Sequence, residues 1–202
     1  MKIIAVANTE NKQGKTTLAI NIAYFFTSQN IKTVIIDVQG NTDGLGQYEG
    51  LSRVDVVPIE YLSDIKDEYD IGIIDPPQYL HPLMSEIFKI SDFILIPIVP
   101  TDINLVSFNQ TIQNYLEIKK ERTRLKAKIV LNIVPNNKVL VDKALEILFN
   151  TGIKIHATVI HFRSLYKNEL QINKVLELVS EDRLAKEEIK SLCRELLKEI
   201  NL

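Results

Sequence analysis

Residues 8–17 of the chain read Asn8-Thr9-Glu10-Asn11-Lys12-Gln13-Gly14-Lys15-Thr16-Thr17. An apolar run, Lys2–Ala7, precedes this stretch and predicts a strand, and the residues that follow predict a helix over Thr16–Gln29. A loop between a strand and a helix can wrap its backbone N–H groups around phosphates, and the helix N-terminus adds positive potential. The stretch therefore predicts a phosphate-binding loop for a purine nucleoside triphosphate.

Each residue of the predicted loop has an expected role. Lys15 would reach the β- and γ-phosphates, Thr16 would place its hydroxyl on Mg²⁺, and Thr17 would bond the α-phosphate. The residues expected to surround the phosphates are Asn11, Lys12, Gln13, Gly14, Lys15, Thr16 and Thr17.

The rest of the chain alternates short aliphatic runs with longer amphipathic stretches. The predicted strands are Lys2–Ala7, Thr33–Asp37, Ile71–Asp75, Phe93–Val99, Lys128–Val134 and Lys154–Ile160. The predicted helices are Thr16–Gln29, Pro82–Lys89, Asn104–Arg122, Lys138–Asn150 and Glu181–Ile200. Most of the strands are apolar throughout, which is typical of a parallel sheet that is covered on both faces. The pattern predicts an α/β, doubly wound fold in one domain over residues 1–202.

The composition excludes several classes of protein. Hydrophobic residues make up 46% and charged residues 25%, the balance of a globular chain. The single cysteine, Cys193, excludes an internal disulfide framework and fits a reducing compartment. The apolar run at the N-terminus is too short for a signal peptide core or a membrane span. We expect a cytoplasmic protein that does not enter a membrane.

The loop departs from the usual pattern, because Thr9 stands where a glycine is expected. In this it resembles the deviant Walker A loop of the ParA/MinD family, which also lacks that glycine. The residues that extend the resemblance are Asn8, Asn21-Ile22-Ala23, Asp37, Ile73-Ile74-Asp75-Pro76-Pro77, Ile96-Pro97 and Leu131-Asn132. Their order and spacing are similar to those of the short ParA partition ATPases over nearly the whole chain. The resemblance implies a P-loop NTPase fold with a mainly parallel sheet and helices on both faces.

The resemblance also implies a ligand set. ATP and Mg²⁺ would be the cofactors, with Asp37 and Asp75 holding the metal through water. Asp75 ends an apolar strand, where a carboxylate faces the ligand crevice of an α/β sheet. Asn132 would bind the adenine edge, since a side-chain amide offers both a donor and an acceptor. Ile160 and His161 would form a wall beside the base.

Two departures from the family concern hydrolysis. Glu10 stands where ParA-like loops carry a lysine that reaches the partner's nucleotide. After the second strand, either Gln39 replaces the aspartate that is expected to orient the attacking water, or a two-residue deletion removes that aspartate. Lys12 is a candidate substitute for the missing cation. The candidate catalytic residues are Lys15, Asp37, Gln39 and Lys12. Whether the chain is an ATPase therefore stays open, and slow turnover is expected.

The resemblance implies a partition function: a nucleotide-dependent homodimer that binds DNA without sequence preference and is regulated by a centromere-binding, ParB-like partner. Residues 1–100 contain 7 Lys or Arg and 13 Asp or Glu, whereas residues 101–202 contain 17 and 13. The DNA candidates therefore come from the second half of the chain: Lys119, Lys120, Arg122, Arg124, Arg163 and Lys167. A solvated helix end is the alternative for residues 119–128.

Two other functions are compatible with the sequence. One is that of a non-hydrolysing relative that uses nucleotide as a structural or regulatory ligand. A small-metabolite P-loop kinase would need a lid with clustered arginines, and Arg122 and Arg124 are the nearest approach to one.

Overall fold

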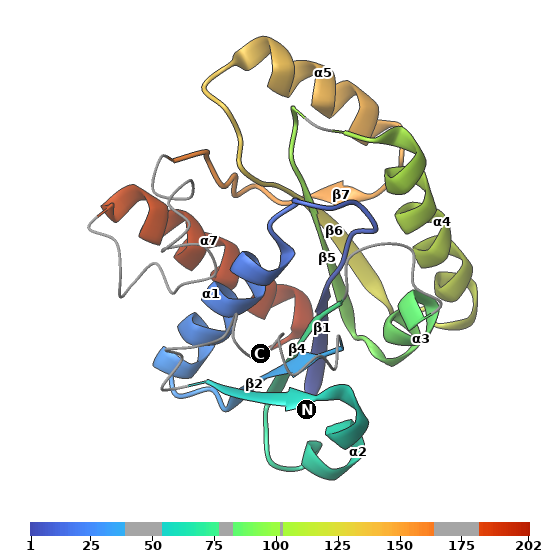
Figure 1. Ribbon diagram of the computed structural model, residues 1–202, viewed down its shortest axis with the longest axis vertical. Coiled ribbons are helices and arrows are strands. Elements are labelled where there is room, and N and C mark those ends of the chain that lie inside the picture. Colours follow the sequence, from blue (N-terminus) through green and yellow to red (C-terminus); the bar gives the residue numbers. More distant parts are fainter. Residues whose placement is uncertain (39–53, 77–82, 102, 164–181) are drawn as a thin grey trace.

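The computed structural model describes residues 1–38, 54–76, 83–101, 103–163 and 182–202. Within them a parallel sheet forms the centre of the molecule, in the order β3-β2-β4-β1-β5-β6-β7 (Figure 1). The strands are β1 Lys2–Val6, β2 Thr33–Asp37, β3 Asp55–Pro58, β4 Ile71–Asp75, β5 Phe93–Ile98, β6 Lys126–Leu131 and β7 Lys154–Ile155. The predicted α/β fold with a parallel sheet is confirmed.

The first strand lies in the middle of this sheet. β1 pairs with β4 on one side and with β5 on the other, and Ile4 is opposite both Ile73 and Phe93. The chain reverses its direction of travel across the sheet at this point. In open α/β sheets, ligands bind beyond the carboxyl ends of the strands at such a reversal. The loop after β1 therefore starts at the expected binding crevice.

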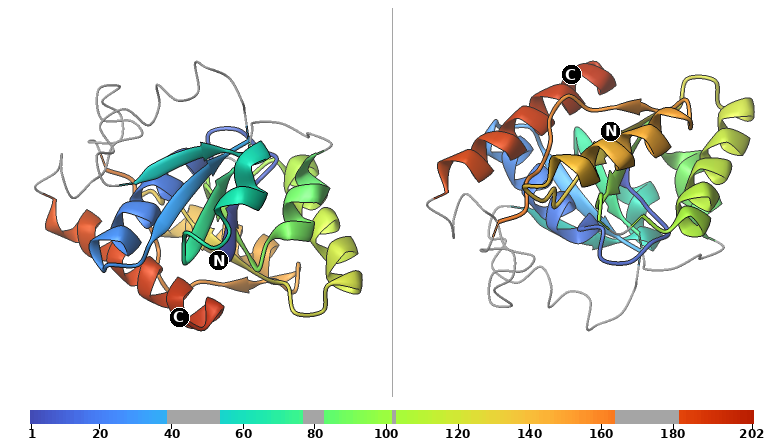
Figure 2. Two further views of the ribbon diagram at one scale, coloured as in Figure 1. Left: turned by 90° about the horizontal axis from the view of Figure 1, so that it is seen from below. Right: turned by 90° about the horizontal axis from the view of Figure 1, so that it is seen from above.

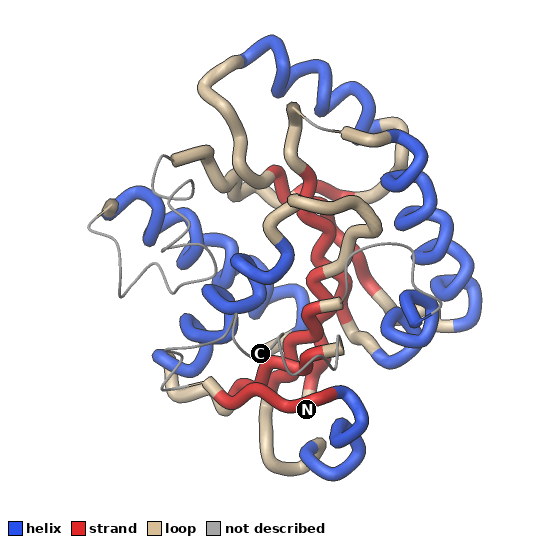
Figure 3. The backbone as a smooth tube through the Cα atoms, in the orientation of Figure 1, coloured by secondary structure: helices blue, strands red, loops and turns tan. Residues whose placement is uncertain are grey.

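Helices cover both faces of the sheet (Figures 2 and 3). The helices are α1 Lys15–Ser28, α2 Leu62–Ile65, α3 Leu83–Ile90, α4 Leu105–Glu121, α5 Lys138–Phe149 and α7 Arg183–Ile200, with a 3-10 turn, η2, at Ile59–Tyr61. One core contains the buried side chains of α1 and α7, and the other those of α3 and α4. Alternate residues of β1 divide between them: Ile4 belongs to the first core and Ile3 to the second.

One segment of the fold was not predicted from the sequence, and one predicted strand is shorter in the structure. β3, η2 and α2 were not predicted, because residues 55–68 mix charged residues with isolated apolar ones at no clear period. The strand predicted over Lys154–Ile160 ends at Ile155. The Glu195 carboxylate accepts hydrogen bonds from the backbone N–H groups of Ala157 and Thr158, so these groups do not join the ladder.

The strand predicted over Lys128–Val134 instead runs from Lys126 to Leu131. It stops before a turn in which Ile133 has a left-handed backbone, with φ 53. No helix among the described residues combines the length and the apolar character needed to cross a bilayer.

Candidate nucleotide-binding site

The phosphate-binding loop predicted from the sequence lies between β1 and α1 (Figure 1). Its bend is made by Lys12 and Gly14, whose φ angles are 57 and 76. Glycine adopts this left-handed conformation without steric cost. It also leaves room for a neighbour, because a Cβ on Gly14 would collide with the side-chain amide of Asn132. A side chain at this position would therefore distort the loop.

The loop leads directly into the N-terminus of a helix. α1 begins at Lys15, and its first turn carries no acidic residue. Gly14 is the N-cap and has no side chain to accept from the first N–H groups of the helix. Such groups, together with the macrodipole, favour an anion. The local geometry therefore fits a phosphate.

Lys15 places a buried cation inside this loop. Its side chain is only 6% exposed, and its Nζ donates to the carbonyl oxygen of Glu10 at 2.9 Å. Burial lowers the pKa of Lys15, and the attraction of Asp75 and Glu10 opposes this effect. A bound phosphate would add further negative charge beside the ammonium group and stabilise its charged form.

Two carboxylates lie near the loop. Asp37 and Asp75 end neighbouring strands, pair in register, and are 3% and 1% exposed. Oxygen ligands of this kind, with the hydroxyl of Thr16 at the helix start, are those that Mg²⁺ prefers. Asn11 Oδ1 is also buried and has no hydrogen-bond partner among the described residues, which leaves an acceptor at the loop for a bound group. The residues present fit a nucleotide–Mg²⁺ complex.

The first residues of the loop are held by α4, a contact that was not predicted from the sequence. The Thr9 N–H donates to Thr111 Oγ1 at 3.1 Å, and the Thr9 hydroxyl donates to the Ser107 carbonyl at 2.6 Å. Asn8 adds a bond from Nδ2 to the Pro97 carbonyl at 2.8 Å. A signal for Thr111 does exist in the sequence, because it is a polar residue on the same helical face as Phe108, at i+3.

The far side of the loop is held by β5 and β6. Gln13 Oε1 accepts from the Val99 N–H at 2.7 Å, and Asn132 Nδ2 donates to the Gln13 carbonyl at 2.8 Å. Asn132 was predicted as a contact of the base, and the structure shows that it also supports the loop. Whether it binds adenine stays a prediction.

The other residues predicted at the base differ from one another. Ile160 is 2% exposed and donates its N–H to the Leu131 carbonyl at 2.9 Å, so it offers little surface to a ligand. His161 is exposed, and its Nδ1 lies 2.9 Å from Glu188 Oε1. Their roles stay predictions.

The residues that depart from the family pattern are only partly described. The Glu10 N–H donates to Asn8 Oδ1 at 2.8 Å, which fixes the turn at the start of the loop. Lys12 is exposed on this loop. Gln39 lies outside the described residues, as does Lys167.

Several predicted DNA contacts have structural partners. Lys119 Nζ donates to the carbonyls of Thr123 and Leu125, and Arg122 donates to those of Lys89 and Ser91. Arg163 is bound by Asp182 at 3.2 Å and by Glu188 at 2.6 Å. Lys120 and Arg124 are both exposed. α4 ends just before β6 begins, so these residues of α4 and its C-terminal turn lie at the amino edge of the sheet, opposite the phosphate-binding loop.

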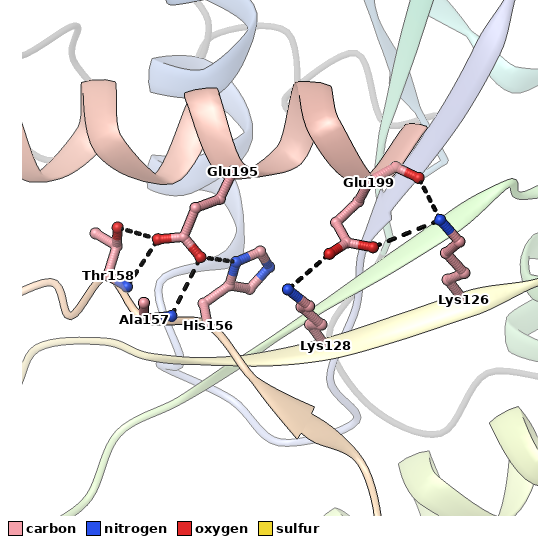
Figure 4. Close-up of polar contacts among 7 residues, drawn as sticks. All are labelled: Lys126, Lys128, His156, Ala157, Thr158, Glu195 and Glu199. Atoms are coloured by element: carbon pink, nitrogen blue, oxygen red, sulfur yellow. Dashed lines mark hydrogen bonds and ion pairs between the residues drawn. The ribbon is translucent and has the colours of Figure 1, made fainter. Parts of the chain in front are cut away.

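The C-terminal helix is fastened to the sheet by two glutamates (Figure 4). Glu195 Oε2 lies 2.9 Å from His156 Nδ1, and Glu199 Oε1 lies 2.7 Å from Lys128 Nζ. Burial alone would raise the pKa of Glu195, but hydrogen bonds from Thr158, His156 and Ala157 outweigh it and lower the pKa to about 2. Burial lowers the pKa of His156, against the pull of Glu195.

Comparison with known proteins extends these findings. The sequence-family model of the CobQ/CobB/MinD/ParA nucleotide binding domain matches residues 4–176 of this chain. The maintenance of carboxysome distribution protein A of Halothiobacillus neapolitanus is 27% identical over 206 residues, covering 96% of this chain and 95% of the relative.

Solved structures share the fold. Apo McdA of Cyanothece superposes with a TM-score of 0.75 at 16% identity and covers 98% of this chain and 99% of its own. The cobyrinic acid a,c-diamide synthase of Mycobacterium smegmatis, solved with an ATP analogue and magnesium, has a TM-score of 0.75 at 15% identity over 98% of this chain and 94% of its own.

Proposed function

Since this chain belongs to the CobQ/CobB/MinD/ParA nucleotide-binding family, we propose that it is an ATP-dependent positioning protein of the ParA type. In this proposal the chain binds ATP with Mg²⁺, associates with a second copy, holds DNA without sequence preference, and distributes a cargo along it.

The observation that carries this proposal is the buried Lys15 ammonium within a left-handed loop at the start of α1. This arrangement offers a cation, backbone N–H groups and a helix dipole to one anionic group. Lys15 would bind the β- and γ-phosphates, while Thr16, Asp37 and Asp75 would hold Mg²⁺, the two carboxylates through water. The metal would neutralise charge on the phosphates when bound.

Turnover in this proposal is slow. Phosphoryl transfer depends on cations placed around the transferred group and on a residue that orients water. Glu10 supplies a carboxylate where the family has a lysine, and the aspartate expected at or beside Gln39 is absent. The ATP complex would therefore persist, which suits a protein that acts while nucleotide is bound.

The proposed cargo is a DNA replicon, attached through a ParB-like centromere-binding partner. The chain also has a relative whose name assigns it to carboxysome distribution, and the two match over 96% of this chain. A protein body is therefore the second candidate cargo. DNA binding would depend on Lys120 and Arg124, whose side chains have no hydrogen bond or ion pair among the described contacts.

Removing the Lys15 cation tests the proposal. Lys15→Ala loses a charge-assisted contact, and we expect its affinity for ATP–Mg²⁺ to fall by about ten- to more than a hundredfold. Calorimetric titration measures the affinity, and sedimentation with and without ATP–Mg²⁺ measures self-association. The control is Lys32→Ala, which removes an exposed lysine just before β2, at the opposite end of that strand from Asp37. Equal affinity in the Lys15 and Lys32 variants would refute the proposed site.

A further inference from the structure

The side chain of Gln13 is buried within the phosphate-binding loop. It is 2% exposed, although glutamine is mostly an exposed residue. Its Oε1 accepts from the Val99 N–H at 2.7 Å, and its Nε2 donates to the Asn11 carbonyl at 3.2 Å. One amide thus ties the middle of the loop to the residue that follows β5.

Asn132 supports the same residue from the next strand. Its Nδ2 donates to the Gln13 carbonyl at 2.8 Å, and its side chain occupies the space that Gly14 leaves open. Its own N–H donates to the Ile98 carbonyl at 2.8 Å, so its backbone is fixed at the end of β6. Gln13 is therefore held in two ways: its side chain bonds to Val99 and Asn11, and its backbone carbonyl accepts from Asn132.

The turn after Asn132 carries strain. Ile133 has a φ of 53, which is unfavourable for a β-branched residue. Such a conformation persists only where the surroundings over-determine it, and it concentrates at functional sites. Here the Val134 N–H donates to the Ile160 carbonyl at 2.9 Å and holds the turn in place. The strained turn fixes the position from which Asn132 reaches the loop.

We infer that Gln13 is a positioning residue of the nucleotide site, with Asn132 as a second support, and that together they hold residues 11–14 in their anion-binding shape before nucleotide arrives. This inference rests on the proposed function. A loop that is shaped in advance binds at its full rate, whereas a loop that is shaped only part of the time binds at a rate reduced by that fraction. Loss of the support should therefore slow association rather than speed dissociation.

The first test replaces Gln13 by methionine, which keeps the length of the side chain and removes both hydrogen bonds. The control is Gln29→Met, at the exposed C-cap of α1. Stopped-flow measurement with ribose-labelled ATP and Mg²⁺ gives both rate constants. We expect the association rate of Gln13→Met to fall about tenfold, as for the loss of two modest hydrogen bonds, with the dissociation rate within about twofold of the control. Equal association rates would overturn the inference.

The second test uses tripolyphosphate with Mg²⁺, a ligand that has no base. Asn132→Ala should weaken its binding by about fivefold relative to Asn136→Ala, since one supporting hydrogen bond is lost. Asn136 is exposed on the following loop. If Asn132 acts only on the base, the two variants will bind tripolyphosphate equally, and that result would overturn its supporting role. Should Gln13→Met fail to fold in a urea unfolding control, this second test decides alone.

The tests also separate this inference from the proposed function. If the unmodified protein fails to bind ATP–Mg²⁺, or if Lys15→Ala binds it as well, the nucleotide site itself is wrong. If Lys15→Ala loses binding while Gln13→Met and Asn132→Ala match their controls, the site holds and only the positioning role is refuted.

Discussion

The two edges of the sheet use their cations differently. At the carboxyl edge, the Lys15 ammonium is buried, and it faces a backbone carbonyl within a loop shaped for an anion. At the amino edge, Lys119 and Arg122 bind carbonyls of neighbouring turns, and Lys128 binds Glu199. The number of basic residues in a segment therefore does not reveal their purpose; the groups they face do. We therefore expect the cations of the carboxyl edge to bind ligands and most of those at the amino edge to stabilise the fold.

The largest expected effect concerns catalysis at the carboxyl edge. We expect slow phosphate release from the unmodified protein, and an increase of at least several hundredfold in the double variant Glu10→Lys, Gln39→Asp. One charge that stabilises the transition state contributes about 3–4 kcal/mol, which alone is a factor of several hundred in rate. Glu60→Lys is the control, because it makes the same charge change at an exposed site beside β3.

Two outcomes would revise this prediction. Fast turnover in the unmodified protein that is abolished by Lys12→Ala would assign the missing cation to Lys12. Fast turnover that survives Lys12→Ala would show that the departures at Glu10 and Gln39 do not limit the reaction.

An intermediate effect is expected where α7 meets the sheet. The pKa of Glu195 is about 2 in the folded protein, against an ordinary value of 4.5. Its stabilising contribution is thus complete above about pH 4.5 and is lost as the pH falls toward 2. The lowered pKa of His156 acts in the same direction, because protonation below its ordinary 6.5 favours the unfolded chain.

Glu195→Ala should therefore lower the free energy of unfolding at pH 7 by about 2 kcal/mol, since four donor groups on three residues lose a charged acceptor. Urea unfolding between pH 7 and pH 3 should show a shallower decline with acid than in the unmodified protein. Glu187→Ala, at an exposed position of the same helix, is the control. An unchanged pH dependence in Glu195→Ala would mean that the cluster in Figure 4 does not stabilise the fold.

The smallest effects separate the residues of the amino edge. Arg122→Ala should cost about 1 kcal/mol of stability, because it removes donors from two carbonyls at the end of α3. Lys120→Ala and Arg124→Ala should leave stability nearly unchanged. The affinity for DNA falls as salt rises, and each variant should reduce the magnitude of the slope of log affinity against log salt by about 1. If all three variants alter the slope equally, the distinction drawn from their partners is wrong.

The sheet and the loop could be predicted from the sequence because short, contiguous stretches of residues specify both. Apolar runs specify buried parallel strands, and Gly14-Lys15-Thr16 follows one of them directly. The supports of the loop were not predictable in the same way. Thr9 bonds to Thr111 and Gln13 bonds to Val99. The two residues of each pair are far apart in the sequence, and only the fold brings them together.

The weakest sequence predictions were those for DNA binding, and the reason is physical. Phosphate contacts need no motif, so any lysine or arginine qualifies. The partner of Lys128 is Glu199 at the end of α7, and the partners of Arg122 are carbonyls at the end of α3. The short strand β3 escaped notice because its residues, Asp55–Pro58, are only partly buried and show no continuous apolar run.

The central place of β1 has a consequence for the order of folding during synthesis. Its two neighbours, β4 and β5, begin at Ile71 and Phe93, so β1 emerges from the ribosome long before either exists. At about 5–20 residues per second, the chain from the end of β2 to the end of β5 takes roughly 3–12 s to make. Until Ile71 is made the first strand and its loop have neither neighbour, and until Phe93 is made they have only β4. We expect nascent chains that stop before Ile98 to be digested readily by protease, and chains that extend past it to become resistant.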